Sequence, residues 1–209
     1  MKRIVIIMTF AVAVSVAAYS QFTIGPKAGG NISKLAYDNK YLNTEAKYGF
    51  QLGGFIKYDF TSSWFIQSEL MYSRHRSFFE LNLSEYGGGI TIGGYNITYN
   101  YLLVPVVGGY RFGNSGFYIE AGFQPGVYLD SHYSIKNNRL EDVFNDYYPE
   151  KWNSMMLSMV GGFGYNFRNG LTLSARYCHG LTNNSLTVQR IESTNHTLQF
   201  SAAYNLWSF

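Results

Sequence analysis

The 209-residue chain has a single cysteine, Cys178, few charged residues and, after Gln21, no apolar run long enough to form a membrane helix. One cysteine excludes an intramolecular disulfide and supports neither a zinc site nor a redox pair. Only 14% of the residues are charged, whereas the chain contains 22 Gly, 19 Tyr and 16 Phe. This composition is unusual for a soluble protein. If the chain crosses a membrane beyond Gln21, it must do so with strands.

The first residues have the pattern of a secretory signal peptide. Lys2 and Arg3 form a basic n-region, residues 4–17 an apolar h-region, and Ala18-Tyr19-Ser20 a small-x-small cleavage site. A retained membrane anchor is the alternative, but the run is short for ~30 Å of hydrocarbon. We therefore expect a cleaved leader over residues 1–20 and one domain over residues 21–209.

The charge of the expected mature chain is nearly balanced. Loss of Lys2 and Arg3 from 16 basic residues leaves 14, against 13 acidic residues. A net charge this small gives no electrostatic signature for nucleic acid.

Eight stretches alternate apolar and polar residues with a period of two, which is typical of strands. In residues 47–60 the apolar parity reads Tyr48, Phe50, Leu52, Gly54, Ile56, Tyr58 and Phe60. We expect no charge on the apolar faces, and we expect strands over residues 22–34, 47–60, 64–76, 97–112, 117–130, 153–167, 171–180 and 195–207. The pattern predicts lipid outside and a polar lumen inside, and therefore an all-β fold, an eight-stranded antiparallel up-and-down transmembrane β-barrel.

The connections between these strands alternate in length. Residues 61–63, 113–116 and 168–170 predict tight turns, whereas the intervening connections at about 35–46, 77–96, 131–152 and 181–194 are long. Short periplasmic turns and long extracellular loops are typical of outer-membrane barrels. We therefore expect a Gram-negative outer-membrane protein with both termini in the periplasm. Within the second long connection, apolar residues on both sides of Gly87-Gly88-Gly89 predict a hairpin that extends the third and fourth strands.

Three prolines, Pro26, Pro105 and Pro125, fall inside expected strands, where each removes a backbone donor. They predict bulges at which the alternation between wall and lumen slips by one residue.

The polar parity predicts a charged lumen, because it carries Lys27, Lys57, Glu69, Arg111, Glu120 and Arg176. An eight-stranded barrel is about wide enough for its side chains to fill, and unpaired buried charges are strongly destabilising. We expect these residues to meet as a hydrogen-bonded network. A structural plug is the favoured interpretation, and a gate or narrow ion path is the functional alternative. Cys178 lies on the same parity and is expected to be a small lumen filler.

Small outer-membrane barrels also include lipid-modifying enzymes and proteases, which need a histidine near a serine or an acid. The four histidines His75, His132, His179 and His196 fall near the outer ends of strands or in a loop, within possible reach of Ser73, Asp130 and Ser131. No spacing matches a nucleophile–base motif. We therefore expect no catalytic residues, no cofactor and no enzyme activity.

The long connections are rich in aromatic residues, which are common in contact surfaces and at membrane interfaces. We take as candidate contacts Phe78, Phe79, Tyr86, Tyr147, Tyr148 and Trp152. The acidic residues Glu141, Asp142, Asp146 and Glu150 lack the spacing of an EF-hand calcium loop, so no metal site is expected.

Five segments in order resemble one family: IGPKAGGN at 24–31, QSELMYS at 67–73, YLLVPVV at 101–107, FYIEAG at 117–122 and RYCHGLTN at 176–183. The chain resembles the outer-membrane beta-barrel domain (porin-family, PorT-like) proteins of Bacteroidetes, which are similar to the OmpX and OmpA barrels. The resemblance implies that Pro26 and Pro105 are family features and that Glu69 matches the Glu of the third-strand segment.

The resemblance bears on the last strand as well. Trp207 and Phe209 lie on the opposite parity from Tyr204 and Leu206. The family implies that Tyr204-Asn205-Leu206 ends the strand and that Trp207-Ser208-Phe209 is a short tail; an assembly signal ending on Phe209 is the alternative.

The leading hypothesis is a non-enzymatic integral outer-membrane protein with a filled lumen. It would act through extracellular loops in adhesion, envelope stability or assembly with partners. Its expected partners are outer-membrane lipid, the outer-membrane assembly machinery and surface or secretion-apparatus proteins. The alternatives are a PorT-like component of a protein secretion apparatus, a lipid-modifying enzyme at the rim, and a soluble periplasmic ligand-binding barrel.

Overall fold

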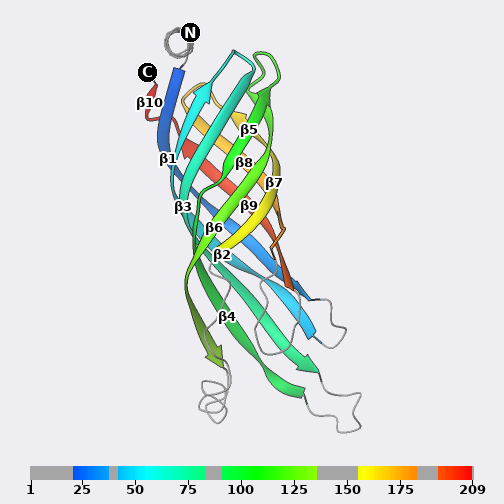
Figure 1. Ribbon diagram of the computed structural model, residues 1–209. Helices are drawn as coiled ribbons and strands as arrows, with labels where there is room; N and C mark the ends of the chain where they lie inside the picture. The colour runs from blue at the N-terminus through cyan, green and yellow to red at the C-terminus, as the bar shows by residue number, and fades with distance from the viewer. Residues whose placement is uncertain (1–20, 38–41, 83–90, 136–154, 183–192, 209) are drawn as a thin grey trace, which may run out of the picture.

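The computed structural model describes residues 21–37, 42–82, 91–135, 155–182 and 193–208 of the chain as one antiparallel β-sheet rolled into a barrel (Figure 1). Its strands are β1 (Gln21–Tyr37), β2 (Leu42–Asp59), β3 (Trp64–Asn82), β4 (Thr91–Leu103), β5 (Val106–Arg111), β6 (Phe117–Ile135), β7 (Met155–Asn166), β8 (Leu171–Gly180), β9 (Ser193–Tyr204) and β10 (Trp207–Ser208). Among the described residues, no helix has the length and hydropathy needed to span a bilayer.

These ten segments act as eight barrel strands. β4 and β5 continue one another, since both pair with β3 and with β6. β9 and β10 likewise both pair with β1, which closes the barrel because β1 also pairs with β2. The predicted eight-stranded antiparallel up-and-down barrel is confirmed.

The strands are tilted, and the pairing register shows by how much. A row of paired residues that starts at Gln21 on β1 and is followed strand by strand around the barrel returns to β1 at Asn31. This stagger is the shear of the barrel, which together with the strand number fixes its width. A barrel of this size has an interior that side chains can fill.

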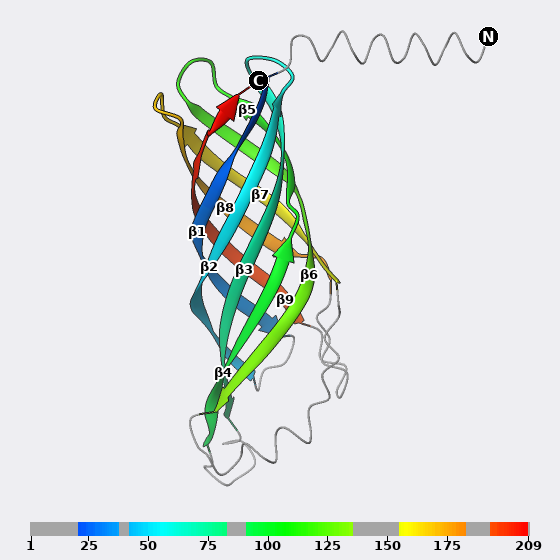
Figure 2. The same ribbon diagram turned by 90° about the vertical axis from the view of Figure 1, so that its left-hand side faces the viewer.

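The two ends of the barrel differ (Figures 1 and 2). The turn end holds the tight turns at residues 61–63, 112–116 and 167–170, the first residues of β1 and the short strand β10. In one of these turns Gly170 has a φ of 86°, a conformation that favours glycine, and its carbonyl accepts a hydrogen bond of 2.9 Å from the Asn205 amide. The opposite end, from which the longer connections leave, is called the loop end below.

The outer wall is apolar and the interior polar, as the alternation predicts. Large apolar side chains such as Leu70, Phe123 and Phe200 are more than half exposed on the outside, while Lys27, Gln124 and Gln199 on the opposite parity are buried. At the turn end the wall carries aromatic contacts, including Trp64 with Tyr110 at 4.9 Å and Tyr165 with Phe167 at 4.8 Å between ring centroids. This is the aromatic girdle expected at a membrane interface.

The prediction that the outer face carries no charge is wrong at the loop end. Lys34 and Arg76 are exposed on the outward parity of β1 and β3, and Arg74 shares that parity. All three lie on the loop-end side of Ile32 and Tyr72, where the alternating apolar stretches of the wall stop. They therefore mark where the apolar wall ends.

The sheet changes its pairing at the loop end. The β1–β2 register ends at Ser33 and Lys47, beyond which the described part of β1 pairs only with β9. β3 and β4 continue outward as a hairpin, with Leu81 opposite Ile92 and Asn82 opposite Thr91. The predicted hairpin extension is therefore present for these residues, and the pictures show β4 reaching furthest from the turn end (Figure 1). Gly87-Gly88-Gly89 lie outside the described residues.

The prolines have smaller effects than predicted. Pro105 separates β4 from β5, so the strand expected over 97–112 is interrupted. Its neighbours keep their register, however, and Leu103, Pro105 and Val107 all face the lumen. The Glu69 amide still donates to the Pro105 carbonyl at 2.9 Å, so the missing N–H removes one ladder bond without a slip.

A true slip occurs in the last strand, where β9 ends at Tyr204 and β10 begins at Trp207. Opposite this break lies Pro26, and the Leu206 amide donates to the Ile24 carbonyl at 2.9 Å. As a result Leu206 and Trp207 are both exposed on the wall, although they are neighbours in sequence. β9 thus ends at Tyr204, but Trp207 and Ser208 resume pairing with β1 instead of forming an unpaired tail. Phe209 lies outside the described residues.

A charge in the middle of the wall tests the membrane-facing assignment. Val106 lies midway between Leu102 and Tyr110 on the outward face of the β4–β5 strand, whereas Phe112 follows the turn end of β5. We expect Val106→Lys to lower the free energy of unfolding in lipid vesicles by about 2–4 kcal/mol and Phe112→Lys by about 0–1 kcal/mol. Reversible guanidinium unfolding measures both, and equal effects would contradict the assignment.

Candidate functional site

A buried ion cluster crosses the lumen between four strands: Lys27 on β1, Glu69 on β3, Glu120 on β6 and Arg176 on β8. The Lys27 Nζ donates to Glu69 Oε1 at 2.8 Å, and Arg176 Nη2 donates to the same oxygen at 2.7 Å. Arg176 also holds Glu120 through two bonds, from Nε at 2.6 Å and from Nη2 at 3.0 Å. Two acids and two bases are thus matched, which offsets the desolvation of each.

The Arg176 side chain crosses the intervening strand β7 to contact Glu120. Glu120, Gly162 and Arg176 are successive partners in one row across β6, β7 and β8. A Cβ atom at Gly162 would lie 2.8 Å from the Arg176 Cγ. The missing side chain on β7 therefore leaves the space through which the guanidinium crosses to the carboxylate.

Two of the six charged residues expected in the lumen network do not join this cluster. Arg111 pairs with Asp59 at the turn end and lies over the Phe65 ring at 4.9 Å from its centroid. Lys57 is buried and, with Arg111 and Gln67, lines a cavity of about 10 Å³, which holds about one water. Asp59 was not among the residues expected in the network, and its ion pair with Arg111 separates Arg111 from the cluster.

Toward the loop end, a polar layer fills the next level of the lumen. His75 is buried between two serines, with Nδ1 at 2.6 Å from the Ser33 Oγ and Nε2 at 2.9 Å from the Ser73 Oγ. The Asn31 amide nitrogen donates to the Ser73 hydroxyl at 3.2 Å. Cys178 is buried in the lumen beside Val107 and Val160, in agreement with its expected filling role.

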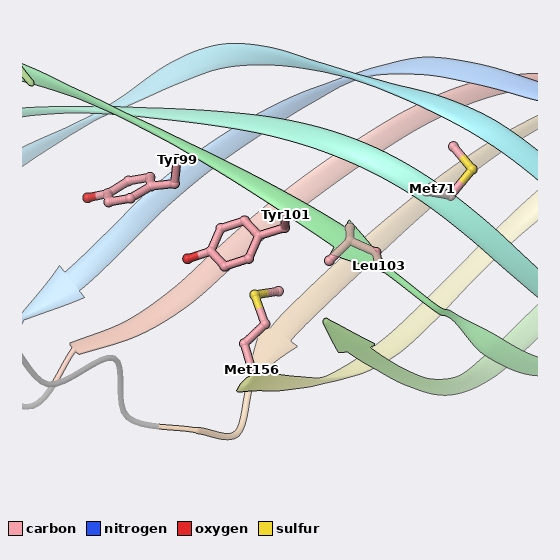
Figure 3. Close-up of a cluster of buried hydrophobic side chains, with 5 residues drawn as sticks. All are labelled: Met71, Tyr99, Tyr101, Leu103 and Met156. Atoms are coloured by element: carbon pink, nitrogen blue, oxygen red, sulfur yellow. The ribbon is translucent and has the colours of Figure 1, made fainter. Parts of the chain in front are cut away.

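An apolar cluster packs beside this polar layer (Figure 3). Its buried members are Met71, Tyr99, Tyr101, Leu103 and Met156. The Tyr101 ring lies edge-on to His75, with 5.5 Å between ring centroids. Ion cluster, polar layer and apolar cluster together fill the lumen in the described part of the barrel.

The residues considered for catalysis lie in different parts of the barrel. His75 contacts two serines, but both lie inside the packed lumen. Asp130 accepts a hydrogen bond from the Asn100 amide nitrogen, and the side chains of Ser131 and His132 lie outside the described residues. Nor do the described residues include a group of three or more His, Cys, Asp or Glu side chains arranged for a metal.

The remaining two histidines meet on the outer wall, a contact that sequence reasoning did not predict. His179 on β8 and His196 on β9 are direct register partners, and their Nδ1 atoms are 3.3 Å apart. The Tyr177 hydroxyl lies 2.8 Å from the His196 Nδ1. The residues are far apart in sequence, so only the pairing of β8 with β9 reveals the pair.

The aromatic loop candidates are mostly beyond what the structure describes. Tyr86, Tyr147, Tyr148 and Trp152 lie outside the described residues. The backbones of Phe78 and Phe79 belong to the protruding part of β3, opposite Asn96 and Tyr95 of β4.

Residues 15–186 of the chain match the family described as outer membrane protein beta-barrel domain. The chain belongs to this family. It is therefore an outer-membrane β-barrel protein. This agrees with the resemblance to outer-membrane beta-barrel domain proteins and with the predicted location in the outer membrane. No curated protein matches the chain.

Solved structures of other outer-membrane proteins share this architecture at low identity. Neisserial surface protein A is 11% identical with a TM-score of 0.52, over 88% of this chain and 97% of its own. OprG from Pseudomonas aeruginosa is 13% identical with a TM-score of 0.48, over 91% and 96%. Ail, the attachment invasion locus protein of Yersinia pestis, is 16% identical with a TM-score of 0.46, over 91% and 99%. At this identity, the likeness to Neisserial surface protein A shows a shared fold and nothing about function.

The ion cluster makes a specific prediction about the outer-membrane barrel's stability. Arg176→Met leaves Glu69 with Lys27 and Gln67 as its partners and leaves Glu120 with no hydrogen-bond partner among the described residues. We therefore expect the free energy of unfolding in vesicles to fall by about 3–5 kcal/mol. The double change Arg176→Met with Glu120→Met removes a matched pair and leaves Lys27 on Glu69.

We expect this double variant to be more stable than Arg176→Met alone, because no buried carboxylate is left without a partner. Denaturant unfolding of the wild type and the two variants, and of Glu120→Met, completes a double-mutant cycle. Additive losses would show that Arg176 and Glu120 do not stabilise each other.

Proposed function

We propose that this protein is a non-enzymatic outer-membrane barrel that acts at its loop end, through contact with other molecules in adhesion, envelope stability or assembly with partners. The observation that carries the proposal is the lumen closed by Lys27, Glu69, Glu120 and Arg176, beneath strands that extend past the barrel wall. A barrel without an open path leaves its ends and its outer wall as surfaces on which it can act.

The closed lumen argues against transport. An ion that passes through would have to break at least one of the bonds of 2.6–2.8 Å that hold Arg176 and Lys27 to their carboxylates. Each break leaves a desolvated charge without a partner, which is unfavourable by several kcal/mol. The cluster therefore acts as a plug.

Open strand edges at the loop end favour a role in binding. Beyond Ser33 and Lys47 no β1–β2 partners occur among the described residues, so residues 42–46 of β2 pair only with β3. An exposed edge presents unpaired N–H and C=O groups to which an added strand can bind.

The orientation belongs to the same proposal. The turn end carries the tight turns and the terminal strands, and the loop end carries the long connections. In outer-membrane barrels the short turns face the periplasm. Both termini of residues 21–208 would then be periplasmic, and the open edges would face the cell exterior.

Conductance measurements test the plug. We expect the purified protein to give no steady single-channel steps in planar bilayers, because the matched ion cluster fills the lumen. An open-pore outer-membrane protein that conducts in the same bilayers is the positive control. Steady, voltage-independent steps from the wild type would overturn the plug and favour an ion path.

Trimming the protruding hairpin tests the binding role. Residues 79–95 are replaced by Asn-Gly, a two-residue hairpin turn that joins Phe78 to Asn96. We expect adhesion, detergent resistance of cells or cross-linking to envelope partners to fall, while the barrel keeps its heat-dependent gel shift. The matched control replaces the turn-end residues 113–116 with another tight turn, and should change none of these readouts.

A deletion strain distinguishes the alternatives. Loss of export of specific cargo with an intact envelope would replace the proposal with a role in a secretion apparatus. Altered lipid profiles in a His75→Ala or His179→Ala strain would replace it with lipid modification. Full adhesion, envelope resistance and partner cross-linking in the hairpin-trimmed strain would refute the loop-end role.

A further inference from the structure

The histidine pair on the outer wall has the geometry of a chelating site. His179 and His196 face each other across the β8–β9 ladder, with their ring centroids 4.8 Å apart and the rings inclined at 54°. Their Nδ1 atoms are separated by 3.3 Å. Because the two residues are direct partners in an antiparallel pair, the backbone holds their side chains next to each other before any ligand binds.

The separation of the two nitrogens matches what a metal ion requires. Zinc binds imidazole nitrogen at about 2.0–2.1 Å in tetrahedral geometry, which places two ligand nitrogens about 3.3–3.4 Å apart. We propose that His179 and His196 form a binding site for a late first-row divalent transition metal ion on the outer wall. The Nδ1 lone pair of each ring binds the ion, and each ring keeps its proton on Nε2.

A third donor group lies beside the pair. The Tyr177 hydroxyl is 2.8 Å from the His196 Nδ1, and its ring stacks on the His196 ring at 21° and 6.2 Å. The hydroxyl therefore lies where it can join the ligand set or hold a metal-bound water. Water fills the remaining positions, because both histidines are partly exposed.

The donor set selects the class of metal. Imidazole nitrogen suits copper, zinc and nickel, whereas calcium and magnesium require oxygen ligands. Among divalent first-row ions Cu²⁺ binds such sites most tightly, so Cu²⁺ is the probe of choice and Zn²⁺ the second.

The position of the pair makes it reachable from water. Along β9 and β8, His196 and His179 come one outward-facing position beyond Leu198 and Tyr177, both of which are exposed on the apolar wall. Lys34 on β1 is the register partner of His196 and is exposed. The row therefore lies where the wall changes from apolar to charged, in the interfacial region.

Lys34 supplies a matched control. Its ammonium shares the row but has no lone pair to offer, and its positive charge opposes a bound cation. Lys34→Ala should therefore leave Cu²⁺ affinity unchanged or increase it, although it alters the same surface as the histidine substitutions.

The test uses the full protein purified from outer membranes in detergent, without a polyhistidine tag, and titrated with CuCl₂. Calorimetry gives the affinity and stoichiometry, and electron paramagnetic resonance shows whether nitrogen binds the copper. We expect one Cu²⁺ per chain with nitrogen coordination, at least a tenfold loss of affinity in His179→Ala and in His196→Ala, and no loss in Lys34→Ala. The heat-dependent gel shift checks that each variant remains folded.

Two results would overturn the site. In one, the wild type binds no Cu²⁺ with nitrogen coordination. In the other, both histidine variants keep wild-type affinity, which would place the copper elsewhere on the chain. Neither result bears on the loop-end role, because the hairpin and the histidine pair are separate parts of the barrel.

Discussion

The lumen of this barrel depends on one guanidinium. Arg176 holds Glu69 and Glu120 at once, and Lys27 completes the neutral set. Charges enclosed by a narrow barrel cannot rely on water, so each carboxylate group must find a donor inside the lumen. The cluster ties β1, β3, β6 and β8 together across the interior, where backbone pairing links only neighbouring strands. Because little water is available in the lumen, the charges there must pair with one another, and this pairing holds the four strands together.

On the outside of the barrel, the side chains must be apolar because they face lipid. Lipid satisfies no backbone or side-chain polar group, so the sheet must close and its outward residues must be apolar. The wall meets this requirement between the aromatic residues of the turn end and the row of Lys34, His196 and His179. Past that row the sheet no longer needs to close, and the separation of β1 from β2 occurs there. The features that can bind a partner or an ion are accordingly found where the constraint of the bilayer ends.

The sequence anticipated much of the fold because strands with one face on lipid and the other on a polar lumen alternate with a period of two, and this pattern recurs in all eight segments. It also placed Lys27, Glu69, Glu120 and Arg176 in the lumen as members of one charged network. It did not separate these four from Lys57 and Arg111, since the preference of Arg111 for Asp59 depends on which ends of β2 and β5 lie close together. Pro105 led to a predicted slip that the intact registers on both sides prevent.

By itself the sequence determined the class of the protein. The alternation indicated which side chains face outward and which face the lumen. Their composition indicated lipid on the outside of the wall and polar surroundings on the inside. Only the tertiary structure decided which lumen charges pair, because the stagger of the closed sheet sets their relative height and Gly162 leaves room for Arg176 to cross. It alone brought His179 to His196, since the contact arises from the register between β8 and β9. Periodicity is a local property of the chain, whereas register depends on how the whole sheet closes.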